Sequence, residues 1–261
     1  MHQALWVSKT GLTAQDQRLG VISNNLANVS TTAFKKDRII FNDLMYQIKK
    51  EPGGASSADT ELPSGLLVGT GVRTVATQKI HTAGSIEVTD VSTDVAIVGR
   101  GFFRVLLPDG EPAYTRDGSF QLNSDGEVVT AAGMPLDPPL AIDDRYRSVT
   151  VGRDGTVSAT DSTTGDTVQI GNIDIVDFLN PAGLLSLGDN LFQATESSGD
   201  ETVGTPSEDG FGYLVQGSLE MSNVNVVEEM VNMISTQRAY EMNSKVVSTA
   251  DQMLQFLNQN V

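Results

Sequence analysis

Cysteine is absent from this chain of 261 residues. Its absence excludes disulfides, thiolate metal sites and cysteine nucleophiles, and it fits an oxidising compartment. Histidine is scarce as well, because only His2 and His81 occur, and neither stands in the spacing of a metal site or a catalytic triad. The sequence therefore predicts no metal and no cofactor.

Long hydrophobic runs are also lacking. No stretch approaches the roughly 18 consecutive apolar residues that a membrane-spanning helix needs. The first residues show no basic segment followed by an apolar core, so they do not form a secretory signal peptide. We expect no membrane insertion, and any export would proceed without a cleaved signal.

Positive charge is in short supply, with 17 Lys and Arg against 33 Asp and Glu. Residues 1–50 carry a net charge of +4, residues 51–217 of −17 and residues 218–261 of −3. No basic stripe is available to displace counterions, which excludes nucleic acid as a partner. The two ends are mildly complementary, and the acidic middle keeps an exposed surface soluble.

The C-terminal stretch 218–261 contains neither proline nor glycine, so it predicts one long helix. Asn225 occupies an N-cap position with Glu228 at the third helical position, which is a capping box. Small and apolar residues then recur at spacings of three and four and predict one face that needs a partner. This face comprises Val231, Ser235, Ala239, Met242, Val246, Ala250, Met253, Leu257 and Val261, widened at its start by Val227, Met230 and Ile234.

The N-terminal stretch 1–29 carries a leucine at every seventh residue, with a second heptad position three residues later. The leucines are Leu5, Leu12, Leu19 and Leu26, and the second position holds Ser8, Gln15, Ile22 and Val29. A coiled-coil seam and an ordinary amphipathic helix explain this pattern equally well. We expect Leu19 and Leu26 to pack on the Val231–Val261 face, in a helix that Gly11 and Gly20 make marginal until it is packed.

Residues 23–35 follow this helix and carry three asparagines within five residues. Asparagine tolerates the left-handed conformation and bonds stray backbone groups, so it favours a helix end. Ser30, Thr31 and Thr32 favour a turn, and Phe34 anchors the chain as it leaves. A polar helix stop explains these residue types, but it does not explain their order.

That order resembles the N-terminal signature of the bacterial flagellar rod and hook axial proteins. The matching residues are Asn24, Asn25, Ala27, Asn28, Thr32, Ala33, Phe34 and Lys35. The family often has glycine where this chain has Ala33, which makes a positive φ less expected there.

The resemblance returns at the other end of the chain. Residues 219–224 and 233–241 are similar to the family's C-terminal signature, through Ser222, Asn223, Gln237, Arg238, Ala239 and Tyr240. Residues 94–103 and 114–120 are similar to stretches of the family's β-rich domain. The match therefore spans nearly the whole chain, in the family's order.

Residues 47–71 are rich in Gly, Ser and Pro, a composition typical of a linker. Their apolar residues nevertheless need cover, so we expect an extended arm laid against neighbouring subunits. The residues of this arm are Pro52, Leu62, Pro63, Leu66, Leu67 and Val68. Such a segment resembles the distal rod members of the family and is not typical of the hook members.

Residues 72–217 show short apolar runs between Asp-Gly turns, which predicts strands. The run from 168 to 178 changes phase and indicates a bulge or break at Gly171-Asn172. The expected fold is α+β. A helical terminal domain comprises 1–34 and 218–261 and forms a coiled coil, 35–71 is an extended connecting arm, and 72–217 is a mainly β outer domain.

The resemblance implies a structural subunit of the flagellar distal rod rather than an enzyme. Such a subunit polymerises through its terminal helices into a stiff hollow drive shaft that connects the proximal rod to the hook. It lies in the flagellar basal body, from the periplasm to the outer membrane, and is exported by the flagellar type III apparatus. Its implied partners are further copies of itself, the proximal rod proteins, the hook or hook-junction proteins and the surrounding ring proteins. The expected assembly residues are Leu5, Leu12, Leu19, Ile22, Leu26, Val231, Ile234, Met242, Val246, Met253 and Leu257.

Other functions remain open at this point. A hook-type or proximal-rod subunit would share the same signatures. A glycan-cleaving enzyme would need two carboxylates in a cleft, which the acidic middle could supply. A soluble binding protein with a helical stalk is a third class.

Overall fold

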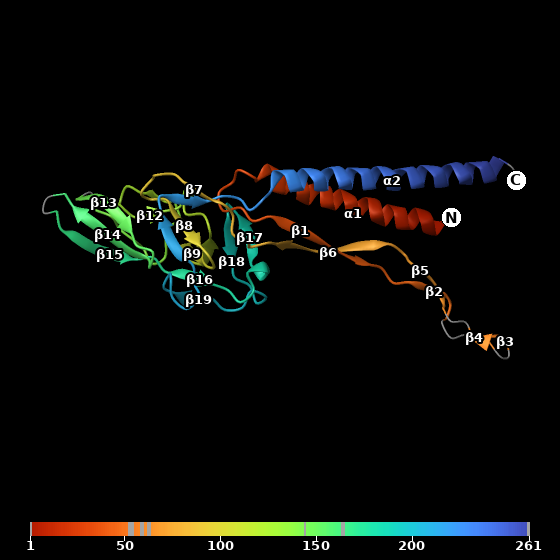
Figure 1. Ribbon diagram of the computed structural model, residues 1–261, viewed down its shortest axis with the longest axis horizontal. Helices are drawn as coiled ribbons and strands as arrows, with labels where there is room; N and C mark the ends of the chain where they lie inside the picture. Colours follow the sequence, from red (N-terminus) through yellow and green to blue (C-terminus); the bar gives the residue numbers. More distant parts are fainter. Residues whose placement is uncertain are drawn as a thin grey trace. The chain divides into compact units, whose positions relative to one another are not determined.

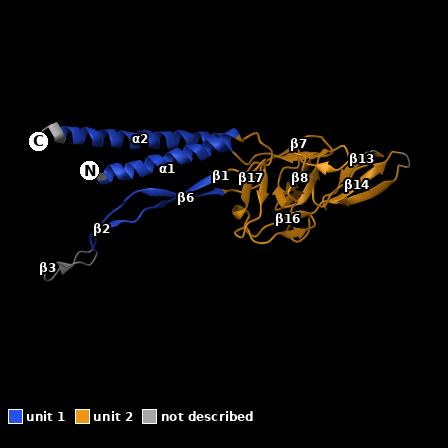
Figure 2. Cartoon of the chain, turned by 180° about the vertical axis from the view of Figure 1, so that it is seen from behind, with its two compact units in different colours: residues 1–27, 37–78, 225–261 blue, residues 28–36, 79–224 orange. Residues whose placement is uncertain are grey.

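The chain folds into an α+β protein with two compact units (Figures 1 and 2). The computed structural model describes residues 2–51, 55–57, 60–61, 64–143, 145–162 and 165–259, without the side chains of 2, 55–57, 60–61, 147 and 257–259. Unit 1 comprises residues 1–27, 37–78 and 225–261, and unit 2 comprises 28–36 and 79–224. Each unit therefore draws on separate parts of the sequence.

Two long helices dominate unit 1. Helix α1 (His2–Ala27) and helix α2 (Val226–Gln259) lie side by side (Figures 1 and 2). The predicted N-cap of α2 is confirmed, because Asn225 Oδ1 accepts hydrogen bonds from the backbone N–H groups of Val227 and Glu228 at 3.0 and 3.3 Å. A Cβ on Gly11 would lie 3.1 Å from Asn243 Nδ2, so the two helices approach closely there.

The face that α2 turns toward the interior of unit 1 shares only small residues with the predicted apolar one. Its buried residues are Glu229, Thr236 and Ala250, of which Ala250 alone belongs to the predicted face, and Ala239 of that face is half-buried. Val231 and Met242, in contrast, are 61% and 63% exposed, and Val246 and Met253 are exposed too. The expectation that Leu19 and Leu26 pack on the Val231–Val261 face is therefore wrong for the large apolar residues of that face. Helix periodicity identifies an apolar face, but it does not identify which molecule covers that face.

The heptad leucines of α1 are also less buried than expected. All four are half-buried, whereas the most buried residues of α1 are Ser8, Ala14, Ile22 and Asn25. Because small and polar residues fill the seam, the backbones of α1 and α2 can come close together.

A two-stranded ribbon forms the rest of unit 1 (Figure 1). Strand β1 (Asp37–Asp43) pairs with β6 (Val72–Lys79), β2 (Gln47–Lys50) pairs antiparallel with β5 (Leu66–Val68), and β3 (Ala55–Ser57) pairs with β4 (Thr60–Glu61). Residues 72–78 thus belong to this ribbon, whereas the sequence analysis had placed them in the outer domain. The predicted arm residues Pro52, Leu62 and Pro63 lie outside the described residues.

The ribbon is attached to α1 within unit 1. The backbone N–H of Val72 donates to Thr10 Oγ1 at 3.3 Å, and Thr74 donates from its hydroxyl to Gln17 Oε1. Gly71 has a φ of 122°, and a Cβ there would overlap the Thr10 side chain. The close approach of the ribbon to α1 therefore requires glycine at this position.

Unit 2 is built on a six-stranded sheet with the order β17-β18-β10-β9-β16-β19. These strands are β17 (Leu185–Gly188), β18 (Leu191–Gln193), β10 (Pro112–Thr115), β9 (Phe102–Leu106), β16 (Ile175–Asp177) and β19 (Thr202–Gly204). Adjacent residues on the central strands enter two different apolar clusters: Phe103 and Ile175 join one, Phe102 and Val176 the other. Both faces of the sheet are therefore covered, which explains why these strands are apolar runs without alternation.

A three-stranded sheet packs into the larger cluster through Val149, Val157 and Ile170. Its strands are β13 (Tyr146–Val151), β14 (Thr156–Asp161) and β15 (Thr167–Asn172). The predicted irregularity is confirmed, because the β14–β15 register shifts between Val157 and Ser158, opposite Gly171, and the chain leaves the strand before β16 begins.

Short strand pairs complete unit 2, together with the short 3-10 helix η1 (Pro181–Gly183). Antiparallel pairing joins β7 (Ile86–Val88) to β21 (Ser218–Glu220), β8 (Val95–Val98) to β20 (Tyr213–Gln216), and β11 (Gln121–Leu122) to β12 (Val128–Val129). Residues 28–34 and 218–224, assigned to the helical domain from the sequence, and residues 35–36, assigned to the arm, thus belong to the β-rich unit.

Candidate junction and assembly surfaces

A buried ion pair joins the N-terminal signature to the C-terminal one. Lys35 Nζ lies 2.6 Å from Glu220 Oε1, and the two side chains are 0% and 1% exposed. The ammonium also donates to the Thr82 carbonyl at 2.9 Å, and Glu220 Oε1 accepts from the Gly84 N–H at 2.8 Å. Burial lowers the pKa of Lys35, while the Glu220 carboxylate opposes that shift.

Arg116 adds a second buried cation to this pair. Its Nε lies 3.6 Å from Glu220 Oε2 and donates to the Gly101 carbonyl at 3.1 Å. Both terminal nitrogens donate to the Gly99 carbonyl. Burial lowers the pKa of Arg116, and Glu220 opposes this. One cluster thus unites all the stretches from which the resemblance was inferred, apart from residues 233–241.

An aromatic group lies beside these charges. The ring centroid of His81 is 5.6 Å from that of Phe102 and 5.5 Å from that of Phe192, in edge-on geometry. Burial, with Lys35 and Arg116 nearby, lowers the pKa of His81 to about 4. His81 is therefore neutral at neutral pH and packs as a half-buried ring against Phe102 and Phe192.

Two asparagines of the signatures use their side-chain amides to bond backbone N–H and carbonyl groups, as a neighbouring strand would. Within unit 2, Asn223 Oδ1 accepts from the Lys36 N–H at 2.7 Å, and its amide nitrogen donates to the Ile80 carbonyl at 2.8 Å. Within unit 1, Asn25 bonds both the N–H and the carbonyl of Asp37, each at 2.9 Å. Such two-sided bonding needs an amide, because a carboxylate has no donor.

Ala33 takes a positive φ of 55°, contrary to the expectation from its side chain. The residue is buried, and its N–H donates to the Glu220 carbonyl at 2.7 Å. The neighbouring Thr32 carbonyl accepts from Asn190 Nδ2 at 3.0 Å. These tertiary bonds fix the turn at a conformation that an alanine disfavours.

The remaining signature residues have separate places. Phe34 lies under the Lys79 ammonium, 5.3 Å from its ring centroid, and Asn28 accepts a bond from the Thr31 hydroxyl. Ser222 is buried, and its hydroxyl accepts from the Val224 N–H. Five further signature residues lie on helices of unit 1 and are exposed, namely Asn24, Ala27, Gln237, Arg238 and Tyr240. Ala239, on the same helix as the last three, is half-buried.

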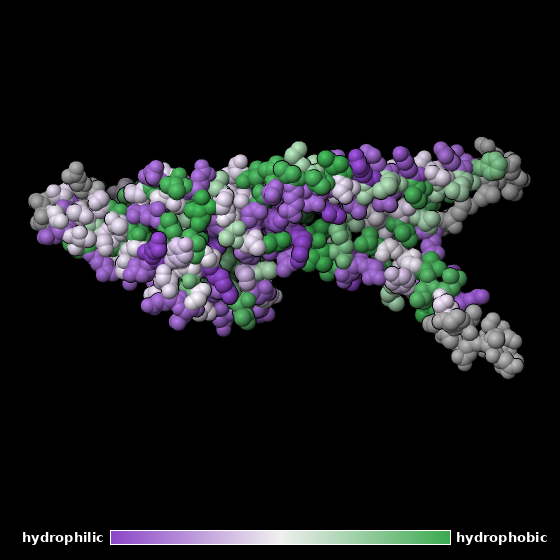
Figure 3. All heavy atoms as spheres, in the orientation of Figure 1, coloured by the Kyte–Doolittle hydropathy of each residue, from purple (hydrophilic) through white to green (hydrophobic). Residues whose placement is uncertain are grey.

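Two apolar surfaces of unit 1 are uncovered in the single chain, and Figure 3 shows hydrophobic surface over the first turns of α2 and around β2 and β5. The first, called the α2 stripe below, comprises Val227, Met230, Val231, Ile234, Met242, Val246, Met253 and Phe256. The second, called the ribbon patch, comprises Met45, Tyr46, Ile48, Leu66 and Leu67, with Val68 half-buried beside it. The side chain of Leu257 lies outside the described part.

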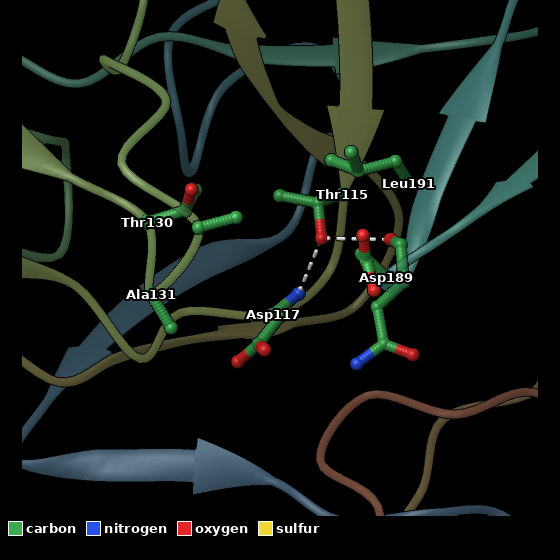
Figure 4. A pocket seen from close by; sticks show the side chains of 8 residues that line it. Thr115, Asp117, Thr130, Ala131, Asp189 and Leu191 are labelled. Carbon is green, nitrogen blue, oxygen red and sulfur yellow. Dashed lines mark hydrogen bonds between the residues drawn. The ribbon is translucent and has the colours of Figure 1, made fainter.

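A polar pocket of about 360 Å³ opens in unit 2 beside β10 (Figure 4). Its wall carries two carboxylates, Asp117 and Asp189, and the Thr115 hydroxyl bonds the Asn190 carbonyl and the Asp117 N–H. Asp117 Oδ1 accepts from the Ser119 N–H, so it closes a turn. The lining holds no histidine, lysine or cysteine that could act as a nucleophile or base.

Among the described residues, no group of three or more His, Asp and Glu could hold a metal ion. Neither described helix combines the length and the apolar character that a membrane span requires.

Comparison with known proteins identifies the family. Residues 5–35 match the family described as flagella basal body rod protein, 96–159 the D1 domain of flagellar hook protein FlgE/F/G, and 215–260 the C-terminal region of flagellar basal body rod FlgEFG protein. The flagellar basal-body rod protein FlgG of Buchnera aphidicola from Acyrthosiphon pisum is 54% identical over 99% of this chain and 100% of its own length. The chain belongs to the FlgG family of flagellar basal-body rod proteins.

Membership in the FlgG family extends across distant bacteria. FlgG of Borreliella burgdorferi is 46% identical over 99% of this chain and 98% of its own length, and FlgG of Bacillus subtilis is 36% identical over 98% of both. The resemblance inferred from the signatures is thereby confirmed. The chain is a structural component of the flagellar basal body and not an enzyme.

Three residues of this FlgG-family chain have places in the cluster that the sequence did not predict. Glu220 and Arg116 lie in the stretches 219–224 and 114–120 without a predicted role, and His81 was considered only as a metal ligand or a member of a catalytic triad. A charged residue next to apolar strand residues indicates that its charge will be buried and paired. It does not indicate the partner, and Lys35 and Glu220 lie 185 positions apart in the sequence.

Proposed function

We propose that this chain is the subunit of the distal rod, which polymerises through its terminal helices into a stiff hollow drive shaft between the proximal rod and the hook. The single observation that carries the proposal is the α2 stripe. Eight apolar side chains stand exposed on one helix, and burying each releases roughly 1.5–3 kcal/mol. In this proposal the α2 stripes of neighbouring copies supply the cover, with α1 and α2 packed in a coiled-coil manner inside each subunit.

The ribbon patch has a second task in this proposal. A tube bends only when neighbouring subunits slide past one another. A ribbon that packs its exposed Ile48, Leu66 and Leu67 on the next subunit opposes such sliding, because every bend would separate the contact. The ribbon is anchored at its base by Thr10 and Gly71, so it can transmit force to α1.

In this proposal the surroundings are those of the distal rod. The subunit assembles in the periplasm toward the outer membrane after export by the flagellar apparatus. It contacts further copies of itself, the proximal rod, the hook or hook-junction proteins and the rings around the rod.

The test is a charge placed in the α2 stripe. Val246→Asp puts a carboxylate at an exposed position, so the isolated subunit keeps its fold, but a subunit contact would then bury an unpaired charge. We expect the variant to form no rods in a strain that lacks its own copy, scored by electron microscopy of isolated basal bodies and by swimming.

Ser244→Asp is the matched control, because Ser244 is an exposed polar residue on the same helix. It should assemble as the parent does. Normal rods from Val246→Asp would disprove the role of the α2 stripe.

A further inference from the structure

We propose that the methionines of the α2 stripe are an oxidation-sensitive site that decides whether a subunit can assemble. Met230, Met242 and Met253 are 51%, 63% and 53% exposed. All three lie on the surface assigned above to subunit contacts, so this inference rests on the proposed function. A free subunit presents these thioethers to the solvent, and an assembled one covers them.

The chemistry needs a peroxide and no other co-reactant. The thioether sulfur attacks one peroxide oxygen, a sulfur–oxygen bond forms and the oxygen–oxygen bond breaks. Sulfur loses two electrons, and hydrogen peroxide is reduced to water. The chain has eight methionines and no cysteine, so no thiol competes for the oxidant.

The consequence depends on where each methionine lies. A sulfoxide on the free α2 stripe stays hydrated and leaves the subunit folded, because these side chains contribute little to its core. In a subunit contact the same sulfoxide would lose its water and face apolar neighbours. Met242 and Met253 are eleven residues apart and share one line of the helix, so oxidation places two polar groups in the same seam.

Other methionines differ in their surroundings. Met134 packs against the larger core cluster of unit 2, and Met233 is half-buried. Met45 is 88% exposed but lies on the ribbon patch. Peroxide should therefore reach the stripe methionines and Met45 first, while Met134 reacts slowly.

The experiment treats the purified full-length chain with hydrogen peroxide and follows each methionine by mass spectrometry. Polymer is measured by sedimentation and negative-stain microscopy, and the fold by thermal unfolding. We expect oxidation to raise the critical concentration for assembly about tenfold or more while unfolding is unchanged. The triple variant Met230→Leu, Met242→Leu, Met253→Leu should assemble and resist peroxide, whereas Met45→Leu should stay sensitive.

A second readout uses cells. Hook–basal bodies are counted after a peroxide pulse during flagellar regrowth, and methionines in isolated rods should oxidise more slowly at the stripe than in the free chain. Equal sensitivity of the triple variant and the parent would overturn the proposal. Normal assembly of oxidised parent, with Val246→Asp still blocked, would refute this inference and leave the proposed function intact. Normal assembly of both would refute both.

Discussion

At the scale of single residues, a buried charge cluster holds the termini of unit 2 together. Lys35 and Glu220 come from opposite ends of the chain, and each loses its hydration on folding. Their mutual attraction compensates for this lost hydration only because each group makes a further hydrogen bond. Lys35 donates to the Thr82 carbonyl, and Glu220 accepts from the Gly84 N–H. The cluster thus specifies one arrangement of the terminal stretches, since any other would leave a buried charge unpaired.

Removal of one member should therefore cost far more than removal of a surface charge. We expect Lys35→Met to lower the free energy of unfolding by about 3–5 kcal/mol, because Glu220 would stay buried without its 2.6 Å partner and with only Arg116, 3.6 Å from its Oε2, as a cation. Arg100→Met is the control, since Arg100 pairs with Asp177 from a side chain that is 66% exposed, and it should cost about 1 kcal/mol or less. Urea unfolding measures both, and equal losses would contradict the role of the cluster.

His81 should make stability depend on pH. Its folded pKa of about 4 lies below its usual value of 6.5, so between these values the unfolded chain binds the additional proton. The free energy of unfolding should therefore fall as the pH drops from about 6.5 to about 4, by at most about 1.4 kcal/mol per unit from this residue.

The measurement compares urea unfolding of the parent and His81→Phe at pH 7 and pH 5. Phenylalanine suits a site between Phe102 and Phe192, and the carboxylates titrate alike in both proteins. The parent should lose more stability than the variant. The same loss in both would show that His81 stays hydrated.

At the scale of elements, α2 has two faces with different partners. Its inner face is small and polar, and its apolar α2 stripe points away from the unit it belongs to. A helix with this distribution is stabilised little by apolar burial within one subunit. Under the proposed function, most of its apolar surface is buried only on assembly. This is the physical reason to expect terminal helices that open easily in a free subunit.

Two glycines of α1 allow a matched test of helix packing. No described atom lies within 4 Å of a Cβ at Gly20, so Gly20→Ala should stabilise unit 1 by about 0.5–1 kcal/mol. Gly11→Ala should stabilise unit 1 less or destabilise it, because its Cβ would lie 3.1 Å from Asn243 Nδ2. Thermal unfolding, monitored by circular dichroism, compares the two variants. Equal gains in stability would mean that the helices are not in contact at Gly11.

At the scale of the whole molecule, the ribbon differs from both a linker and a globular loop. Paired strands extend from β1 and β6 to β2 and β5, and their exposed apolar residues form the ribbon patch. Strand pairing stiffens a segment whose composition is typical of a flexible chain. Under the proposed function, this stiffness passes from the subunit to the rod.

Deletion of residues 45–68, which removes the whole ribbon patch, tests that idea. We expect rods that still form but curve, because subunits can slide once the contact is lost. Electron microscopy of isolated rods measures the curvature. A replacement of the same segment by a Gly-Ser repeat of equal length separates the loss of contacts from the loss of length, and straight rods from both variants would exclude a stiffening role.

The sequence by itself determined the family, the α+β class, the N-cap at Asn225, the strand irregularity near Gly171 and the existence of an apolar face on the C-terminal helix. These features depend on local order, on residue type or on periodicity, which the chain carries at each position. Only the tertiary structure decided that residues 28–36 and 218–224 join the β-rich unit, that Ala33 takes a positive φ, and that the large residues of the apolar face are left exposed. Each of these depends on contacts between residues far apart in the chain, such as Lys35 with Glu220, and local patterns do not encode which distant group will be the partner.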